Sequence, residues 1–71
     1  MMNHHYSMEI HWSDEDQVFL VTLPEFPNCK THGATYTEAV KNGEEVLDLL
    51  IEDYKSQGKP LPQPLTASSR A

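Results

Sequence analysis

Cys29 and His32 are the residues whose types and spacing most directly suggest chemistry in this 71-residue chain. Two residues separate them, and a thiolate and an imidazole at this spacing can bind one zinc ion. His4, His5 and His11 could supply further nitrogen ligands. A structural zinc site usually takes four ligands from two such pairs, however, and the chain offers one pair. The pattern therefore favours a half-buried cysteine and an exposed histidine at a turn, with no metal ion or other cofactor.

A catalytic role would need more than this cysteine. A cysteine nucleophile requires a base and an orienting group within hydrogen-bond reach, and its positive neighbour, Lys30, would point to the opposite side of a strand. Metal-dependent phosphoryl transfer needs carboxylates that converge from several elements. Asp14, Glu15 and Asp16 instead follow one another in a single polar stretch. We therefore predict that the chain is not an enzyme.

The charge of the chain restricts its partners. Eleven Asp and Glu residues against five Lys and Arg give a formal net charge of −6, and all five basic residues lie at or after Lys30. Such a chain repels nucleic-acid phosphates and lacks the basic stripe that binds them, so we expect no direct contact with nucleic acid. The acidity suits a basic protein partner, but it would also serve to keep a small protein in solution.

Size and composition point to one small domain. A chain of 71 residues buries only a modest core, so we expect a homodimer or a higher oligomer. No apolar run approaches the ~18 residues that a membrane span requires, and the first residues lack the apolar segment of a secretory signal. The single cysteine fits a reducing compartment. We expect a cytoplasmic protein without membrane contact.

Two strands are predicted in the first third of the chain. Residues 6–12 alternate between apolar and polar side chains, which is typical of a half-buried strand. The polar stretch 13–17 contains no glycine and predicts a hairpin loop longer than two residues. Residues 18–23 form the second strand, and both of its faces are apolar. Phe19, Val21 and Leu23 lie on one face, and Val18 and Leu20 lie on the other. The second of these faces has no evident cover within one chain.

A stiff connector follows the second strand. Pro24 cannot donate to a strand ladder, so it ends the strand, and Pro27 fixes a second rigid point. The sequence then predicts a short third strand over residues 28–31. Gly33 is placed for a turn with positive φ that leads into a helix.

The helix has the clearest signals. Thr35 and Glu38 have the spacing of a capping box, and Gly58 is placed to end the helix. Apolar residues recur at intervals of three and four: Ala39, Val40, Gly43, Val46, Leu47, Leu50, Ile51 and Tyr54. The predicted helix, residues 36–57, would be roughly 33 Å long at 1.5 Å per residue. It would outreach a six-residue strand, and Gly43 on its apolar face predicts a close approach to the sheet.

These elements predict an α+β fold. We expect an antiparallel sheet of about three strands, in the order β-β-β-α, with one long helix packed on one face. Residues 1–64 would form the single domain. The residues after the proline-rich stretch, 65–71, would be a disordered tail.

The ordered motifs of the chain resemble those of the HicB family of antitoxins, specifically its N-terminal HicB-like domain. The stretches "LPEFPNC", "HGATYTEAV" and "GKPLPQP" correspond to the family patterns P-x-L-P-G-C, T-x-x-E-A and G-x-P-x-P, and the resemblance covers residues 6–64. Asn28 stands where the family usually has glycine, and asparagine also tolerates positive φ. Full-length relatives continue into a DNA-binding segment that "LTASSRA" could not form, so operator binding is not expected here.

The resemblance implies a partly RNase H-like fold that associates with itself, and it implies binding to HicA, a small basic toxin that cleaves mRNA. The predicted function is therefore a non-catalytic module that sequesters such a toxin. The alternative is a stand-alone homo-oligomer, structural or regulatory, that has no toxin. Two candidate contact surfaces follow from the charge and strand patterns. The first comprises Glu9, His11, Val18 and Leu20 on the uncovered face of the sheet, and the second comprises Glu44, Glu45, Asp48 and Glu52 on the helix.

Overall fold

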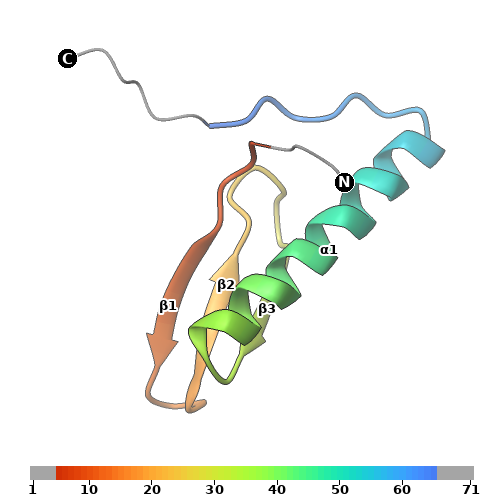
Figure 1. Ribbon diagram of the computed structural model, residues 1–71. Coiled ribbons are helices and arrows are strands. Elements are labelled where there is room, and N and C mark those ends of the chain that lie inside the picture. The colour runs from red at the N-terminus through yellow and green to blue at the C-terminus, as the bar shows by residue number, and fades with distance from the viewer. Residues whose placement is uncertain (1–4, 66–71) are drawn as a thin grey trace.

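The computed structural model describes residues 5–65 and confirms the α+β fold (Figure 1). Three antiparallel strands precede one long helix. The elements are β1 (Glu9–Ser13), β2 (Val18–Thr22), β3 (Lys30–Gly33) and α1 (Tyr36–Ser56). Within residues 5–65, no helix is both long and apolar enough to cross a bilayer.

The sheet has the order β1-β2-β3, so β1 and β3 are its two edges. The register pairs Glu9 with Thr22 at one end of β1 and Ser13 with Val18 at the hairpin end. The hairpin loop has four residues, as expected without a glycine, and Gln17 adopts positive φ in it. β1 begins three residues later than predicted. In the observed register, a ladder that began at residue 6 would place Ser7 opposite Pro24. Pro24 has no N–H group to donate, so the ladder cannot extend to residue 6.

The third strand was predicted two residues too early. The connector forms two successive turns, in which Phe26 N–H donates to the Leu23 carbonyl and Cys29 N–H donates to the Phe26 carbonyl. These turns occupy the chain through Asn28, which adopts the positive φ of 63° that the sequence allowed. β3 can therefore begin only at Lys30.

Gly33 was predicted to adopt positive φ in a turn, but its φ is not positive. It belongs to β3 and is buried under the first turns of α1. A Cβ built on Gly33 would lie 2.4 Å from the Ala39 backbone nitrogen. Glycine is needed at this position so that the helix backbone can approach the strand.

Both ends of α1 are capped as the sequence predicts. The Thr35 side chain accepts a hydrogen bond from the Glu38 N–H, and the Glu38 carboxylate accepts one from the Ala34 N–H. At the other end, Gly58 has a φ of 69°, Gly58 N–H donates to the Lys55 carbonyl and Lys59 N–H donates to the Tyr54 carbonyl. This pair of bonds is a Schellman motif, which satisfies two carbonyl groups of the last turn.

The helix crosses the sheet over β2 and β3, and its C-terminal half extends beyond the strands (Figure 1). Gly43 permits close packing, because a Cβ there would lie 2.7 Å from the Met8 sulfur. The buried core residues are Val21, Leu23, Phe26, Ala39, Leu47 and Ile51. Val40 was predicted on the buried face of the helix but is 39% exposed.

Candidate protein-binding surfaces

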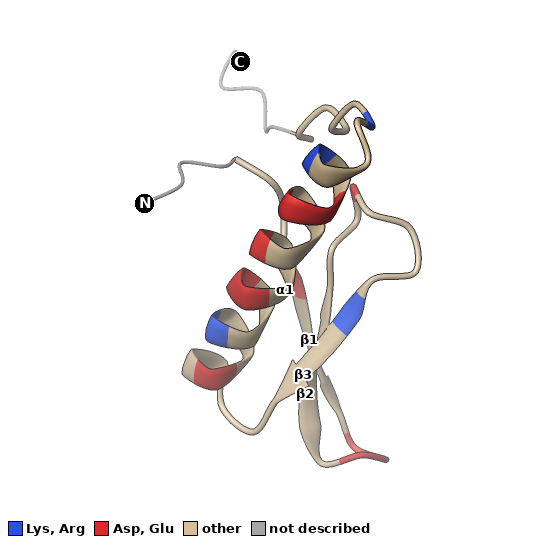
Figure 2. Cartoon of the chain, turned by 90° about the vertical axis from the view of Figure 1, so that its right-hand side faces the viewer, with Lys and Arg blue, Asp and Glu red and all other residues tan. Residues whose placement is uncertain are grey.

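The acidic surface of α1 faces solvent on the side away from the sheet (Figure 2). Its predicted members are Glu44, Glu45, Asp48 and Glu52, and all four are exposed. Leu49 lies among them with 69% of its surface exposed, an apolar side chain that the charge pattern did not single out. The surface thus combines negative charge with one apolar contact point, which suits a basic protein.

The outer face of the sheet carries the other predicted surface. The register places His11, Leu20 and His32 in one row across the three strands, on the face opposite α1. Leu20 is 40% exposed and Val18 is half-buried, as expected for a face without cover. Glu9 is exposed at the end of β1.

A shallow depression of about 290 Å³ marks this outer face. It is lined by Asp16, Val18, Leu20 and His32. The sequence reasoning found the two apolar members but missed Asp16 and His32, which only the hairpin and the β2–β3 register bring beside them. The depression is shallow and open, so it suits contact with a protein surface better than enclosure of a small ligand.

The Cys29–His32 pair is not brought together as a site. Cys29 is half-buried, as predicted, and packs against the core, whereas His32 is exposed on the outer face. Among residues 5–65, no group of three or more His, Cys, Asp or Glu side chains is arranged to hold a metal ion. His4 lies outside the described residues.

Two aromatic clusters flank the core, and other segments of the chain cover the first of them, here called the closed cluster. The closed cluster consists of Tyr6, Phe26 and Tyr54, whose rings meet edge to face at centroid distances of 5.0 and 5.5 Å around Phe26. Phe26 is only 1% exposed. The Tyr6 hydroxyl donates to the Pro62 carbonyl at 2.7 Å, so the proline-rich segment lies against this cluster.

Glu25 holds that proline-rich segment and the residues before β1 together. Its carboxylate accepts hydrogen bonds from the Ser7 N–H at 3.0 Å and from the Leu65 N–H at 2.8 Å. Burial raises the pKa of the Glu25 carboxyl, but the hydrogen bonds from Leu65 and Ser7 outweigh it and leave the pKa below its ordinary value. The deprotonated carboxylate therefore links three segments that lie far apart in the sequence.

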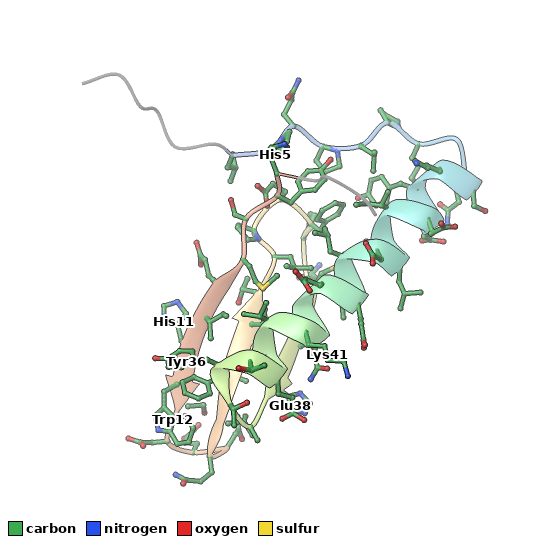
Figure 3. All side chains as sticks on the ribbon, viewed as in Figure 1. His5, His11, Trp12, Tyr36, Glu38 and Lys41 are labelled. Atoms are coloured by element: carbon green, nitrogen blue, oxygen red, sulfur yellow. The ribbon has the colours of Figure 1, made fainter. Side chains whose placement is uncertain are left out.

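The second cluster is open. The open cluster consists of Trp12, Phe19 and Tyr36, with centroid distances of 5.0 Å and 4.2 Å to the central Phe19 ring. Trp12 is 46% exposed and Tyr36 is 66% exposed. Figure 3 shows both on the β1 side of α1, where the helix leaves the sheet uncovered. The alternation of residues 6–12 could not reveal the exposure of Trp12, because this exposure depends on α1 lying too far towards β3 to cover it.

The comparisons with known proteins identify the family. The family model described as "HicB_like antitoxin of bacterial toxin-antitoxin system" matches residues 6–70. The chain belongs to the HicB-like antitoxin family. Among curated proteins, the UPF0150 protein Ta0767 of Thermoplasma acidophilum is 36% identical to it over 50 residues, which cover 70% of this chain and 72% of the relative. No solved structure matches the chain significantly.

Membership of the HicB-like family points to a role in a toxin–antitoxin system. The matched residues include all three strands, the helix and the proline-rich segment. The family match does not assign a role to any single residue, so the acidic surface of α1 and the outer face of the sheet stay predicted contact surfaces.

Proposed function

We propose that this chain is a non-catalytic, cytoplasmic antitoxin module that sequesters a small basic mRNA-cleaving toxin of the HicA type. The observation that carries the proposal is the match of the HicB-like antitoxin model over nearly the whole described chain. The net charge of −6 agrees with a basic partner. Opposite charge would mainly speed the encounter and fix the orientation of the two proteins.

The mechanism is occlusion. The acidic surface of α1 offers four exposed carboxylates on a rigid helix, with Leu49 exposed among them. A toxin that cleaves RNA needs a basic surface for the phosphates of its substrate. Carboxylates placed along that basic surface would take the position of the phosphates, and the bulk of the antitoxin would keep mRNA out.

An alternative function is a homo-oligomer, structural or regulatory, that acts without a toxin. The exposed apolar side chains of Leu20 and Trp12 favour some protein contact in either case. The two functions differ in what the acidic surface does, because a homo-oligomer of an acidic chain gains nothing from it.

The direct test combines the chain with HicA-type toxins encoded in the same genome. Co-expression should restore growth to cells that produce the cognate toxin, and the purified proteins should form a complex that weakens as salt rises. A variant with Glu45→Lys and Asp48→Lys should bind at least tenfold more weakly. Both positions are exposed and lie on the solvent side of α1, so the variant should fold normally.

A charge-matched control uses the opposite end of the molecule. Asp14→Lys together with Glu15→Lys, in the hairpin loop outside both candidate surfaces, changes the net charge equally, and both of these side chains are also exposed. If the two double variants lose the same affinity, charge acts only over long range and α1 is not the contact. Persistent toxicity with every HicA-type toxin of the genome would overturn the proposal.

A further inference from the structure

The proline-rich segment, residues 59–65, runs from the end of α1 back to the residues before β1 (Figure 1). It forms neither a helix nor a strand. Pro62 and Pro64 are half-buried, whereas Leu61 and Leu65 are 37% and 62% exposed. One side of the segment therefore lies on the domain, and the other side faces solvent. We call residues 59–65 the strap.

Side chains hold the strap in place. The Tyr6 hydroxyl donates a hydrogen bond to the Pro62 carbonyl at 2.7 Å. The Ser7 hydroxyl donates to the Leu65 carbonyl at 3.2 Å, and the Leu65 N–H donates to the Glu25 carboxylate at 2.8 Å. These three bonds each use a side chain as donor or acceptor, and none of them belongs to a strand ladder. The strap can therefore leave the domain without breaking the sheet or α1.

The Glu25 carboxylate also holds the opposite end of the domain. Both of its oxygens accept from the Ser7 N–H at 3.0 Å, and Oε2 accepts from the Leu65 N–H as well. Ser7 in turn contacts Leu65 through its hydroxyl. The three residues thus form a closed ring of hydrogen bonds, in which each bond supports the geometry of the others. Loss of the strap takes a partner from Ser7 as well as from Glu25.

We propose that this ring of Ser7, Glu25 and Leu65 is a latch that couples the two ends of the domain. The strap and residues 5–7 open and close together, while the three strands and α1 stay folded. Coupling between two sites is reciprocal, so a contact that orders either end favours the ordered state of the other. The inference is independent of the toxin proposed above, because it concerns contacts within one chain.

The closed state predominates because opening uncovers the core. Phe26 is only 1% exposed, and the Tyr6 ring covers one of its edges at a centroid distance of 5.0 Å. Movement of residues 5–7 away from the domain would expose this apolar ring to water, which is unfavourable. The latch is therefore closed most of the time and opens more often than the sheet, since local openings need less free energy than global unfolding.

Amide hydrogen exchange of the unmodified protein, followed by NMR, tests the coupling. The Ser7 and Leu65 N–H groups share one acceptor and should open together, so their protection factors should agree within about threefold. Both amides should exchange at least tenfold faster than the amides of the central strand β2, which open only when the sheet unfolds. A Leu65 amide without protection would contradict a closed strap.

Gln63→Gly loosens the strap alone. Gln63 is exposed and lies outside the latch, and glycine increases the conformational entropy of the open strap. Exchange at Leu65 should become about threefold faster, and exchange at Ser7, at the other end of the domain, should increase by the same factor. An increase at Leu65 alone would show that the two ends open independently.

Glu25→Gln and Glu15→Gln form a matched pair, because each removes one negative charge and Glu15 is exposed in the hairpin loop. Glu25→Gln weakens the acceptor that Ser7 and Leu65 share, so both amides should exchange about fivefold faster. Glu15→Gln should change neither amide. The unmodified protein and Gln63→Gly still decide the question if Glu25→Gln fails to fold.

Three results would each overturn the latch. The first is a clear difference between the protection of the Ser7 and Leu65 amides in the unmodified protein. The second is a Leu65 amide that is protected as strongly as the amides of β2, which would make the strap part of the core. The third is a response to Gln63→Gly at one end only.

Discussion

The two aromatic clusters have similar arrangements of rings but differ in whether other segments of the chain cover them. Each has a phenylalanine at its centre, a tyrosine from α1 on one side and an aromatic residue from the N-terminal part of the chain on the other. The closed cluster is covered by the residues before β1 and by the proline-rich segment, which Glu25 and Tyr6 hold in place. No described segment covers the open cluster in this way. The closed cluster therefore stabilises the domain, and the open cluster is available for contact.

The central phenylalanines should show this difference most strongly. Phe26→Ala removes a ring that is 1% exposed and should lower the free energy of unfolding by about 3–5 kcal/mol. Phe19→Ala removes a half-buried ring and should cost about 2 kcal/mol. A domain of this size has roughly 3–5 kcal/mol of stability in total, so Phe26→Ala should be largely unfolded in urea titrations started from native buffer. Equal losses in the free energy of unfolding for Phe26→Ala and Phe19→Ala would contradict this difference between the clusters.

Glu25, which links the segments over the closed cluster, should make the free energy of unfolding depend on pH. Its pKa in the folded chain lies below the ordinary value, so the carboxylate contributes stability above that ordinary value and loses it as the pH falls through the folded pKa. We expect the free energy of unfolding to decrease as the pH falls below about 4.5. Glu25→Gln should cost about 1 kcal/mol at pH 7 and progressively less at acidic pH.

The control for Glu25 is Glu15→Gln, which changes an exposed carboxylate in the hairpin loop. It should leave both the stability and its pH dependence nearly unchanged. If Glu25→Gln retains the acid dependence of the unmodified chain, another carboxylate is responsible and the link through Glu25 is not the cause.

The tyrosines of α1 should give the smallest effects. Tyr36 is 66% exposed, so Tyr36→Ala should cost only about 0.5 kcal/mol, mostly from its contact with Phe19. Tyr54 is half-buried against Phe26, and Tyr54→Ala should cost about 1–2 kcal/mol. Thermal unfolding of the two variants at the same protein concentration measures this difference. A larger loss for Tyr36→Ala would mean that the open cluster is part of the core.

Much of the fold could be read from the sequence because local signals dominate it. The capping residues Thr35 and Glu38, the terminal Gly58 and the period of the apolar residues set both ends of α1 to within a residue. The third strand was misplaced because the turns at residues 24–28 depend on hydrogen bonds to neighbouring carbonyls. No local pattern distinguishes the close approach that Gly33 permits from a turn with positive φ.

The candidate surfaces were predictable only in part. Charge and periodicity correctly placed Glu45 and Asp48 on the solvent side of α1, and alternation placed Leu20 on the uncovered face of the sheet. The open cluster was not foreseen, because the exposure of Trp12 depends on where α1 crosses the sheet. The Glu25 link also escaped prediction, since it joins Ser7 and Leu65 from opposite ends of the chain.

Native mass spectrometry of the chain co-expressed with the HicA-type toxins of its genome tests the central claim most directly. The account predicts a complex that contains this chain and one small basic toxin in equal numbers, beside a dimer of the chain when no toxin is present. Recovery of the chain only as a monomer, with no toxin bound at any ratio, would contradict the account.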